Sequence, residues 1–212
     1  KKIELVLEGK SDMYYLEKSM ELLFPEFSDL FEIYDHTQKG GAMQVYNTLD
    51  KFNRSHSKKL VIGLLDNDTE GNRVLEKIQK LDLKNNIQAS CYPDIDIARS
   101  YPYKDHIDGP ITYTDLNKTA GFIELYLGKD VIIKNGTELP TILKKPSAKG
   151  KGSIKYEFEE ERLKHDYIKK QFQIKIESSD QDDPTWNEMR ILLIHLFELA
   201  SALNRKNRIY ER

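Results

Sequence analysis

The chain has 212 residues, of which 39% are hydrophobic and 32% are charged. This composition excludes a disordered protein and provides enough apolar residues for one domain with an appended subdomain. Lys and Arg number 33 against 35 Asp and Glu, a formal net charge of −2, so any basic surface that binds nucleic acid has to be local. No apolar run is long enough to span a membrane. The single cysteine, Cys91, excludes a disulfide within the chain and a thiolate metal cluster. We therefore expect a globular, cytoplasmic protein.

Residues 1–92 alternate short β-like runs with amphipathic helical runs, which is typical of consecutive βαβ units around a parallel sheet. Strands are predicted at residues 3–7, 30–34, 60–65 and 87–92. The third run is continuously apolar, as expected of a central strand that is buried on both faces. Helices are predicted from a Ser11 N-cap to about residue 24, after the Gly40-Gly41 pair, and around Val74 and Ile78. The predicted fold class is α/β, with a mainly parallel sheet flanked by helices.

The regular alternation stops after residue 92. Three prolines and no periodicity predict a loop over residues 93–110, and a helix is predicted over residues 114–126. Asp183 and Pro184 have the types expected at the N-cap and first position of a long C-terminal helix with a broad apolar stripe. We predict a core over residues 1–95, an elaboration over 96–180, and a C-terminal helix over 181–212 that packs on the core or on a partner. The same apolar stripe is a candidate interface for a homo-oligomer.

Acidic side chains follow two of the predicted strands. Glu8 ends the first strand, and Asp12 lies four residues later in the first turn of the next helix. Asp66 and Asp68 follow the third strand, where alternate side chains of an extended segment point the same way. Because ligands of open parallel sheets lie beyond the carboxyl ends of the strands, these four carboxylates are candidates for one site.

Carboxylates that are crowded together repel one another unless a cation neutralises them, and oxygen ligands suit hard ions such as Mg²⁺ or Mn²⁺. Such ions can activate water and stabilise the leaving oxygen in phosphodiester hydrolysis. The alternative role for Glu8, Asp12 and Asp68, taken one at a time, is helix capping and compensation of the helix dipole. Glu70 is a further carboxylate near the site or a helix-start acid, and Asp94 or Asp96, after the fourth strand, is a candidate for an additional ligand.

The segments Leu7-Glu8-Gly9-Lys10-Ser11-Asp12 and Leu65-Asp66-Asn67-Asp68 resemble the paired motifs of the topoisomerase-primase (Toprim) family. The resemblance covers about the first 95 residues and is greatest to nucleases of the overcoming-lysogenisation-defect (OLD) family and related phage-defence proteins. It implies a Rossmann-like core in which Glu8 acts as an acid, base or metal ligand and Asp66 and Asp68 bind metal. It also implies further site residues, for which Glu124 is the candidate metal ligand and Lys164 the candidate for stabilising charge on the phosphate.

From this resemblance we expect a nuclease that depends on Mg²⁺ or Mn²⁺, prefers DNA and acts in phage defence. A ribonuclease of the same family and a catalytically silent Toprim binding module are the alternatives. In the OLD family an ATPase usually precedes the Toprim unit, which implies an ATPase domain or subunit as a partner. Gly9-Lys10-Ser11 lacks the upstream glycine of a phosphate-binding loop, so no nucleotide site is predicted there.

Two groups of side chains are candidates for nucleic-acid contacts. Tyrosines at 101, 103 and 113 could stack on bases, although tyrosines more commonly serve as packing residues. A basic loop without acidic residues could contact phosphates or be a solvated loop, and it carries Lys144, Lys145, Lys149, Lys151 and Lys155. The five histidines show no metal-binding spacing, so zinc is not predicted.

Overall fold

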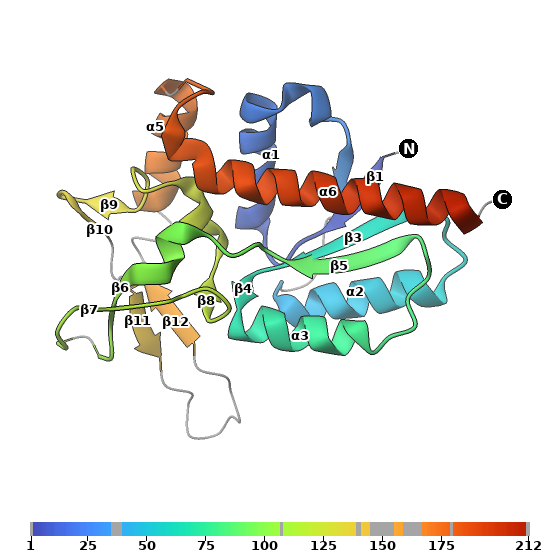
Figure 1. Cartoon of the computed structure of the whole chain (residues 1–212), viewed down its shortest axis with the longest axis horizontal. Helices are drawn as coiled ribbons and strands as arrows, with labels where there is room; N and C mark the ends of the chain where they lie inside the picture. The colour runs from blue at the N-terminus through green and yellow to red at the C-terminus, as the bar shows by residue number, and fades with distance from the viewer. Residues whose placement is uncertain are drawn as a thin grey trace. The chain divides into compact units, whose positions relative to one another are not determined.

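The computed structural model describes residues 2–34, 40–106, 108–138, 141–144, 155–158, 167–178 and 180–210 (Figure 1). The chain divides into two compact units. The first comprises Lys1–Asp66, Glu70–Pro93 and Leu192–Arg212, and the second comprises Asn67–Thr69 and Asp94–Ile191. None of the helices in the described ranges combines the length and apolar character that a membrane crossing requires.

The first unit is built on a four-stranded parallel sheet. Its strands, in the order β2-β1-β3-β5, are β1 (Ile3–Val6), β2 (Phe31–Ile33), β3 (Leu60–Leu65) and β5 (Ile87–Cys91). All six residues of β3 are buried, as its continuous apolar run predicted for a central strand. The sequence prediction of an α/β fold with a parallel sheet is confirmed, and each strand lies within one or two residues of its predicted bounds.

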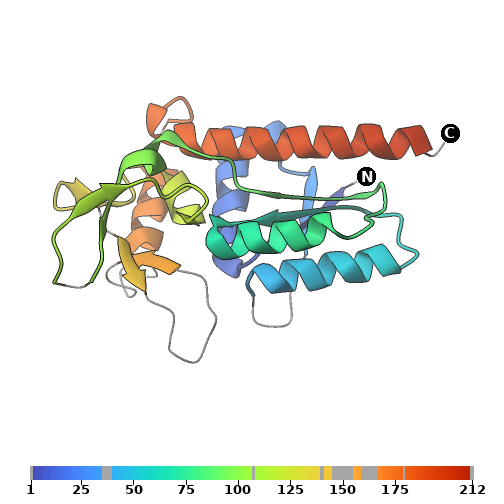
Figure 2. The same cartoon turned by 60° about the horizontal axis from the view of Figure 1, so that its bottom comes forward.

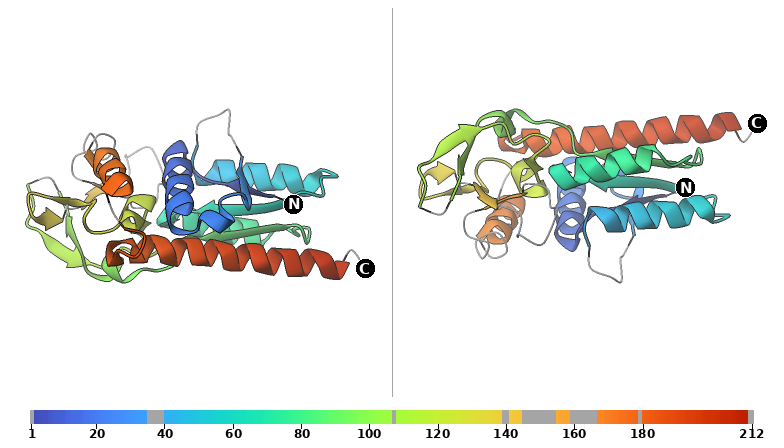
Figure 3. Two further views of the ribbon diagram at one scale, coloured as in Figure 1. Left: turned by 90° about the horizontal axis from the view of Figure 1, so that it is seen from above. Right: turned by 90° about the horizontal axis from the view of Figure 1, so that it is seen from below.

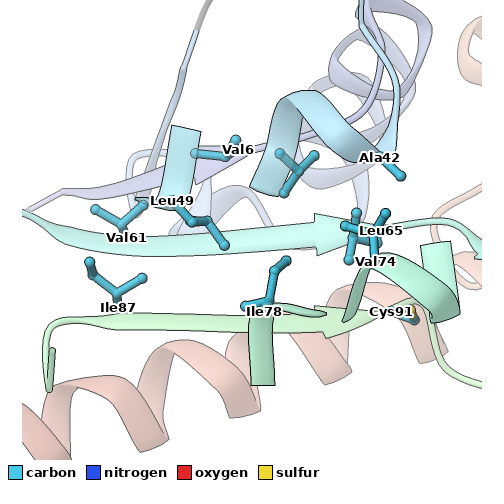
Figure 4. Packing of buried hydrophobic residues seen from close by; sticks show 10 residues of the cluster. Val6, Ala42, Leu49, Val61, Leu65, Val74, Ile78, Ile87 and Cys91 are labelled. Atoms are coloured by element: carbon cyan, nitrogen blue, oxygen red, sulfur yellow. The ribbon is translucent and has the colours of Figure 1, made fainter. Parts of the chain in front are cut away.

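Helices cover both faces of this sheet (Figures 2 and 3). They are α1 (Lys10–Leu23) with the C-terminal part of α6 (Asn187–Tyr210) on one face, and α2 (Ala42–Arg54) with α3 (Thr69–Gln79) on the other. Figure 4 shows apolar side chains of α2 and α3 meeting those of β3 and β5. Gly63 permits this close packing, because a Cβ atom there would lie 2.6 Å from Leu49.

In the described residues of the second unit, short strands and 3₁₀ turns predominate. Its four-stranded sheet has the order β12-β11-β6-β7, and the strands are β6 (Tyr101–Lys104), β7 (Thr112–Thr114), β11 (Thr141–Lys144) and β12 (Lys155–Phe158). Two pairs of two-residue strands accompany it: β4 (Asn67–Asp68) with β8 (Ala120–Gly121), and β9 (Ile133–Lys134) with β10 (Thr137–Glu138). The helix α5 (Lys169–Ser178) and the first residues of α6 also belong to this unit.

Two predictions for this part of the chain were wrong. The predicted loop over residues 93–110 contains a 3₁₀ turn at Asp96–Ser100 and the strand β6. The predicted helix over residues 114–126 is instead the end of β7, the short strand β8 and a 3₁₀ turn at Ile123–Leu127. Tertiary pairing of β8 with β4 replaces the helical hydrogen bonds that the local sequence favours.

The C-terminal helix is confirmed. Asp183 accepts a hydrogen bond from the backbone of Thr185 at 2.8 Å, and Pro184 opens a 3₁₀ turn that continues into α6. The predicted apolar stripe is buried within the chain, and its members are Trp186, Met189, Leu192, Leu193, Leu196, Ala200 and Leu203.

Candidate functional site

The strand order of the first unit reverses between β1 and β3. The chain moves outward from β1 to β2, and then from β2 back across to β3 and on to β5. At such a reversal the connections leave toward opposite faces of the sheet and open a crevice at the carboxyl ends of the two central strands. Glu8 follows β1 and Asp66 follows β3, so the sequence-predicted pair lies at the position where open α/β sheets bind ligands.

Glu8 is tied to both neighbouring segments. Its Oε1 accepts a hydrogen bond from the backbone N–H of Asp66 at 2.9 Å. Its carbonyl oxygen accepts from the N–H of Gly41 at 2.7 Å. A Cβ atom on Gly40 would lie only 2.0 Å from that carbonyl oxygen, so this position requires glycine. The Gly40-Gly41 pair, which the sequence indicated only as the break before a helix, therefore packs against the backbone of Glu8.

Asp12 has the hydrogen bonds of a helix-start acid. Its Oδ2 accepts from the N–H of Gly9 at 3.1 Å, and its Oδ1 accepts from Ser11 Oγ at 3.3 Å. The side chain is buried, at 5% exposure. The N-cap of α1 is Gly9 rather than the predicted Ser11. The capping role that competed with metal binding for Asp12 is thus present in the structure.

The second Asp of the Asp66-Asn67-Asp68 motif belongs to the second unit, as part of β4. Asp68 pairs with Ala120 and Asn67 with Gly121 across the β4–β8 ladder. The Asn67 side chain is 2% exposed, and its Nδ2 donates to Asp94 Oδ1 at 2.7 Å. The middle residue of the motif is therefore buried and held by a polar contact to the half-exposed Asp94, which the sequence did not predict.

The remaining acidic candidates have different surroundings. Glu124, in the 3₁₀ turn at Ile123–Leu127, is buried at 2% exposure. Asp94 lies 3.8 Å from Lys118 Nζ as well as accepting from Asn67, whereas the exposed Asp96 pairs with Arg99. Glu70 lies in the first turn of α3 and forms an ion pair with Arg73.

The donor set at the β1–β3 crevice consists of oxygen ligands. Within the described ranges, no three His, Cys, Asp or Glu side chains are grouped closely enough to hold a metal ion. Mg²⁺ commonly takes only one or two protein carboxylates and completes its octahedron with water and substrate phosphate. Glu8 and Asp66, linked through the 2.9 Å hydrogen bond, provide carboxylates of that type. The residues present therefore fit a hard divalent ion and do not fit a soft one.

Several predicted contacts with nucleic acid can be compared with the structure. Tyr101 is fully buried, and burial raises its pKa well above the ordinary value, so it is a packing residue and cannot stack on a base. Tyr113 is 65% exposed on β7. Lys144 ends β11 and pairs in register with Lys155 of β12. Lys164 and the lysines at 145, 149 and 151 lie outside the described residues.

No protein-family model matches this chain, and neither does any curated protein or solved structure.

Proposed function

We propose that the chain is a nuclease that hydrolyses phosphodiesters with Mg²⁺ or Mn²⁺, and that its centre is the β1–β3 crevice. The observation that carries this proposal is the hydrogen bond from the Asp66 N–H to Glu8 Oε1, which joins the acidic ends of two adjacent parallel strands at the reversal of strand order. A ligand at this position meets two carboxylates, which suit a divalent ion bound to phosphate.

Each residue has a proposed task. Glu8 and Asp66 bind the ion, Asp12 caps α1 at the end of the first strand, and the Gly40-Gly41 pair fixes the backbone of Glu8. When bound, the ion supplies a Lewis acid that activates water and stabilises developing charge. Asp68, Glu124 and Lys164 are assigned to the same chemistry by the resemblance to Toprim nucleases. Lys164 would stabilise negative charge on the phosphate, and DNA is the preferred substrate by that resemblance.

The test is cleavage of supercoiled plasmid, linear duplex, single-stranded DNA and RNA, each with Mg²⁺, Mn²⁺ or a chelator. We expect cleavage of DNA that requires the ion and falls at least about a hundredfold in Glu8→Gln and in Asp66→Asn, as expected for loss of a preorganised charge. Glu76→Gln on the exposed side of α3 removes the same charge elsewhere in the first unit and serves as the matched control.

The other outcomes identify the alternatives. Cleavage confined to RNA, with the same dependence on Glu8, indicates the Toprim ribonuclease. Absence of cleavage of every substrate in the presence of either ion overturns the nuclease proposal and favours a binding module within a larger complex.

A further inference from the structure

A pocket of about 200 Å³ lies between α1 and β2, at the edge of the first unit's sheet. Its apolar lining is formed by Leu5, Leu16, Met20, Phe31 and Ile33. Sites for whole small ligands are commonly about 300–1,000 Å³, so this pocket has the size of a single large side chain. It lies on the sheet face covered by α1, and the β1–β3 crevice does not contribute to its lining.

The polar part of the lining is acidic. It contains Glu17 and Glu21 from α1 and Asp29 from the turn before β2, and no basic residue of the described ranges lines the pocket. Residues 17–33 contain five acidic residues and one lysine, a formal charge of −4. Lys18 forms an ion pair with Glu21. Asp29 lies 3.4 Å from Lys2, and its side chain is 96% exposed. A positively charged occupant would therefore be attracted to this rim.

Within the described part of the chain, the adjacent strand has an open edge, to which no other strand is bonded. β2 is the terminal strand of its sheet, and it bonds to β1 through the Leu30 carbonyl and the Tyr34 N–H, both at 2.9 Å. In a parallel pair, alternate residues bond to the same neighbour. The backbone N–H and C=O groups of Phe31 and Ile33 therefore point toward the open edge, while the side chains of these two residues line the pocket.

We propose that this edge binds an extended basic segment of a partner protein. The segment adds a strand to β2, inserts one aliphatic or aromatic side chain into the pocket, and places Lys or Arg two residues to either side near Glu17, Glu21 and Asp29. Strand addition supplies main-chain hydrogen bonds, and alternate side chains supply specificity. This inference does not depend on the nuclease proposal, because it uses a different face of the unit and none of the catalytic carboxylates.

The probe is a fluorescent peptide with the core Lys-Thr-Leu-Thr-Lys, compared with Glu-Thr-Leu-Thr-Glu and with the basic peptide methylated on alternate backbone nitrogens. We expect the basic peptide alone to bind, and to shift the backbone amide resonances of Phe31 and Ile33. The double variant Glu17→Gln, Glu21→Gln should weaken binding about tenfold, the size expected for two lost surface ion pairs.

Glu76→Gln, which leaves the rim intact, should bind the peptide as the unmodified chain does. Equal binding of the basic and acidic peptides, or no binding at millimolar peptide, overturns the proposal. So does equal weakening of binding in the double variant and in Glu76→Gln. Resonance shifts confined to Glu8 and Asp66 would also overturn it, because they would place the peptide at the crevice. Because both rim glutamates are exposed, the variants should retain the circular dichroism of the unmodified chain, and that spectrum separates lost binding from lost folding.

Discussion

Glu8 Oε1 lies 2.9 Å from the backbone nitrogen of Asp66 and accepts its N–H. This contact connects the ends of two strands across 58 residues of sequence, so one carboxylate oxygen of Glu8 contributes to the fold. A glutamine at position 8 retains an oxygen that can accept the same hydrogen bond and removes only the charge. The substitution therefore separates folding from metal binding.

In the first prediction, Mn²⁺ raises the midpoint of thermal unfolding of the unmodified chain and does not raise that of Glu8→Gln. An ion at a hundred times its dissociation constant stabilises the folded chain by about 2.7 kcal/mol. Without metal the two proteins should unfold at closely similar temperatures. An equal rise with Mn²⁺ in both proteins would place the ion elsewhere.

Gly40 makes a second prediction about the same strand end. In Gly40→Ala the new methyl group would overlap the carbonyl oxygen of Glu8, so the Glu8 backbone has to move. We expect weaker Mn²⁺ binding and a loss of stability on the order of 1–3 kcal/mol, as for other overpacked positions. Titration calorimetry and urea unfolding measure the two effects. In Gly136→Ala a positive φ is strained without any atom within 4 Å of the new Cβ; if it lowers Mn²⁺ affinity equally, steric overlap at Glu8 is not the cause.

Asn67 and Asp94 give a third prediction. Exchanging the two side chains should restore the stability that the single change Asn67→Asp removes. Asn67→Asp places two carboxylates where an amide now donates to Asp94 Oδ1. It should lower the free energy of unfolding by about 1–3 kcal/mol, the cost of a buried group without its partner. The double variant Asn67→Asp, Asp94→Asn re-forms a donor and acceptor and should recover most of that loss in urea unfolding. A double variant that remains as unstable as Asn67→Asp would show that the Asn67–Asp94 hydrogen bond is not the source of the stability.

The sequence predicted the parts of the molecule in which local pattern and tertiary structure agree. The apolar run of β3 and the Asp183-Pro184 start of the last helix are examples, because burial and capping act on neighbouring residues. Residues 114–126 were mispredicted because pairing of β8 with β4 depends on a segment about 50 residues away. Likewise, strand-end position predicted Glu8 and Asp66 as candidates, but the support from Gly40 and the Asn67–Asp94 contact required the three-dimensional structure.

Lys175, on α5, provides the fourth prediction. Its ammonium donates to the carbonyl oxygens of Leu127 and Thr185 and to Asp130 Oδ1, all at 2.8 Å, and its side chain is 2% exposed. Lys175→Met leaves buried acceptors without their donor, and we expect the free energy of unfolding to fall by about 3–5 kcal/mol. Asp130→Asn should cost much less, because that side chain is 39% exposed and two carbonyl acceptors remain. Equal losses in urea unfolding would show that the ion pair with Asp130, and not the burial of the ammonium, determines how much Lys175 contributes to stability.

Lys175 also predicts a pH dependence. Burial lowers its pKa, so the unfolded chain binds this proton more tightly than the folded chain does. Lys175 therefore contributes least to the free energy of unfolding at neutral pH. Its contribution increases as the pH rises from the folded pKa toward the unfolded pKa of about 10.4. The stability difference between the unmodified chain and Lys175→Met should accordingly be larger at alkaline pH than at neutral pH. A difference that is constant with pH would contradict the lowered pKa.

His195 provides the last prediction, for acid conditions. It lies on α6 with its Nε2 3.0 Å from Ser90 Oγ of β5, and burial lowers its pKa, while Glu198 and the backbone of Cys91 act in the opposite direction. Because the unfolded histidine has a pKa of about 6.5, the unfolded chain takes up the proton first as the pH falls, and the folded state loses stability between that pH and the lower folded pKa. His195→Gln should remove this loss when urea midpoints at pH 7 and pH 5 are compared, whereas His56→Gln, at an exposed position, should retain it. If both variants lose stability on acidification as the unmodified chain does, the carboxylates of the chain and not His195 account for its acid sensitivity.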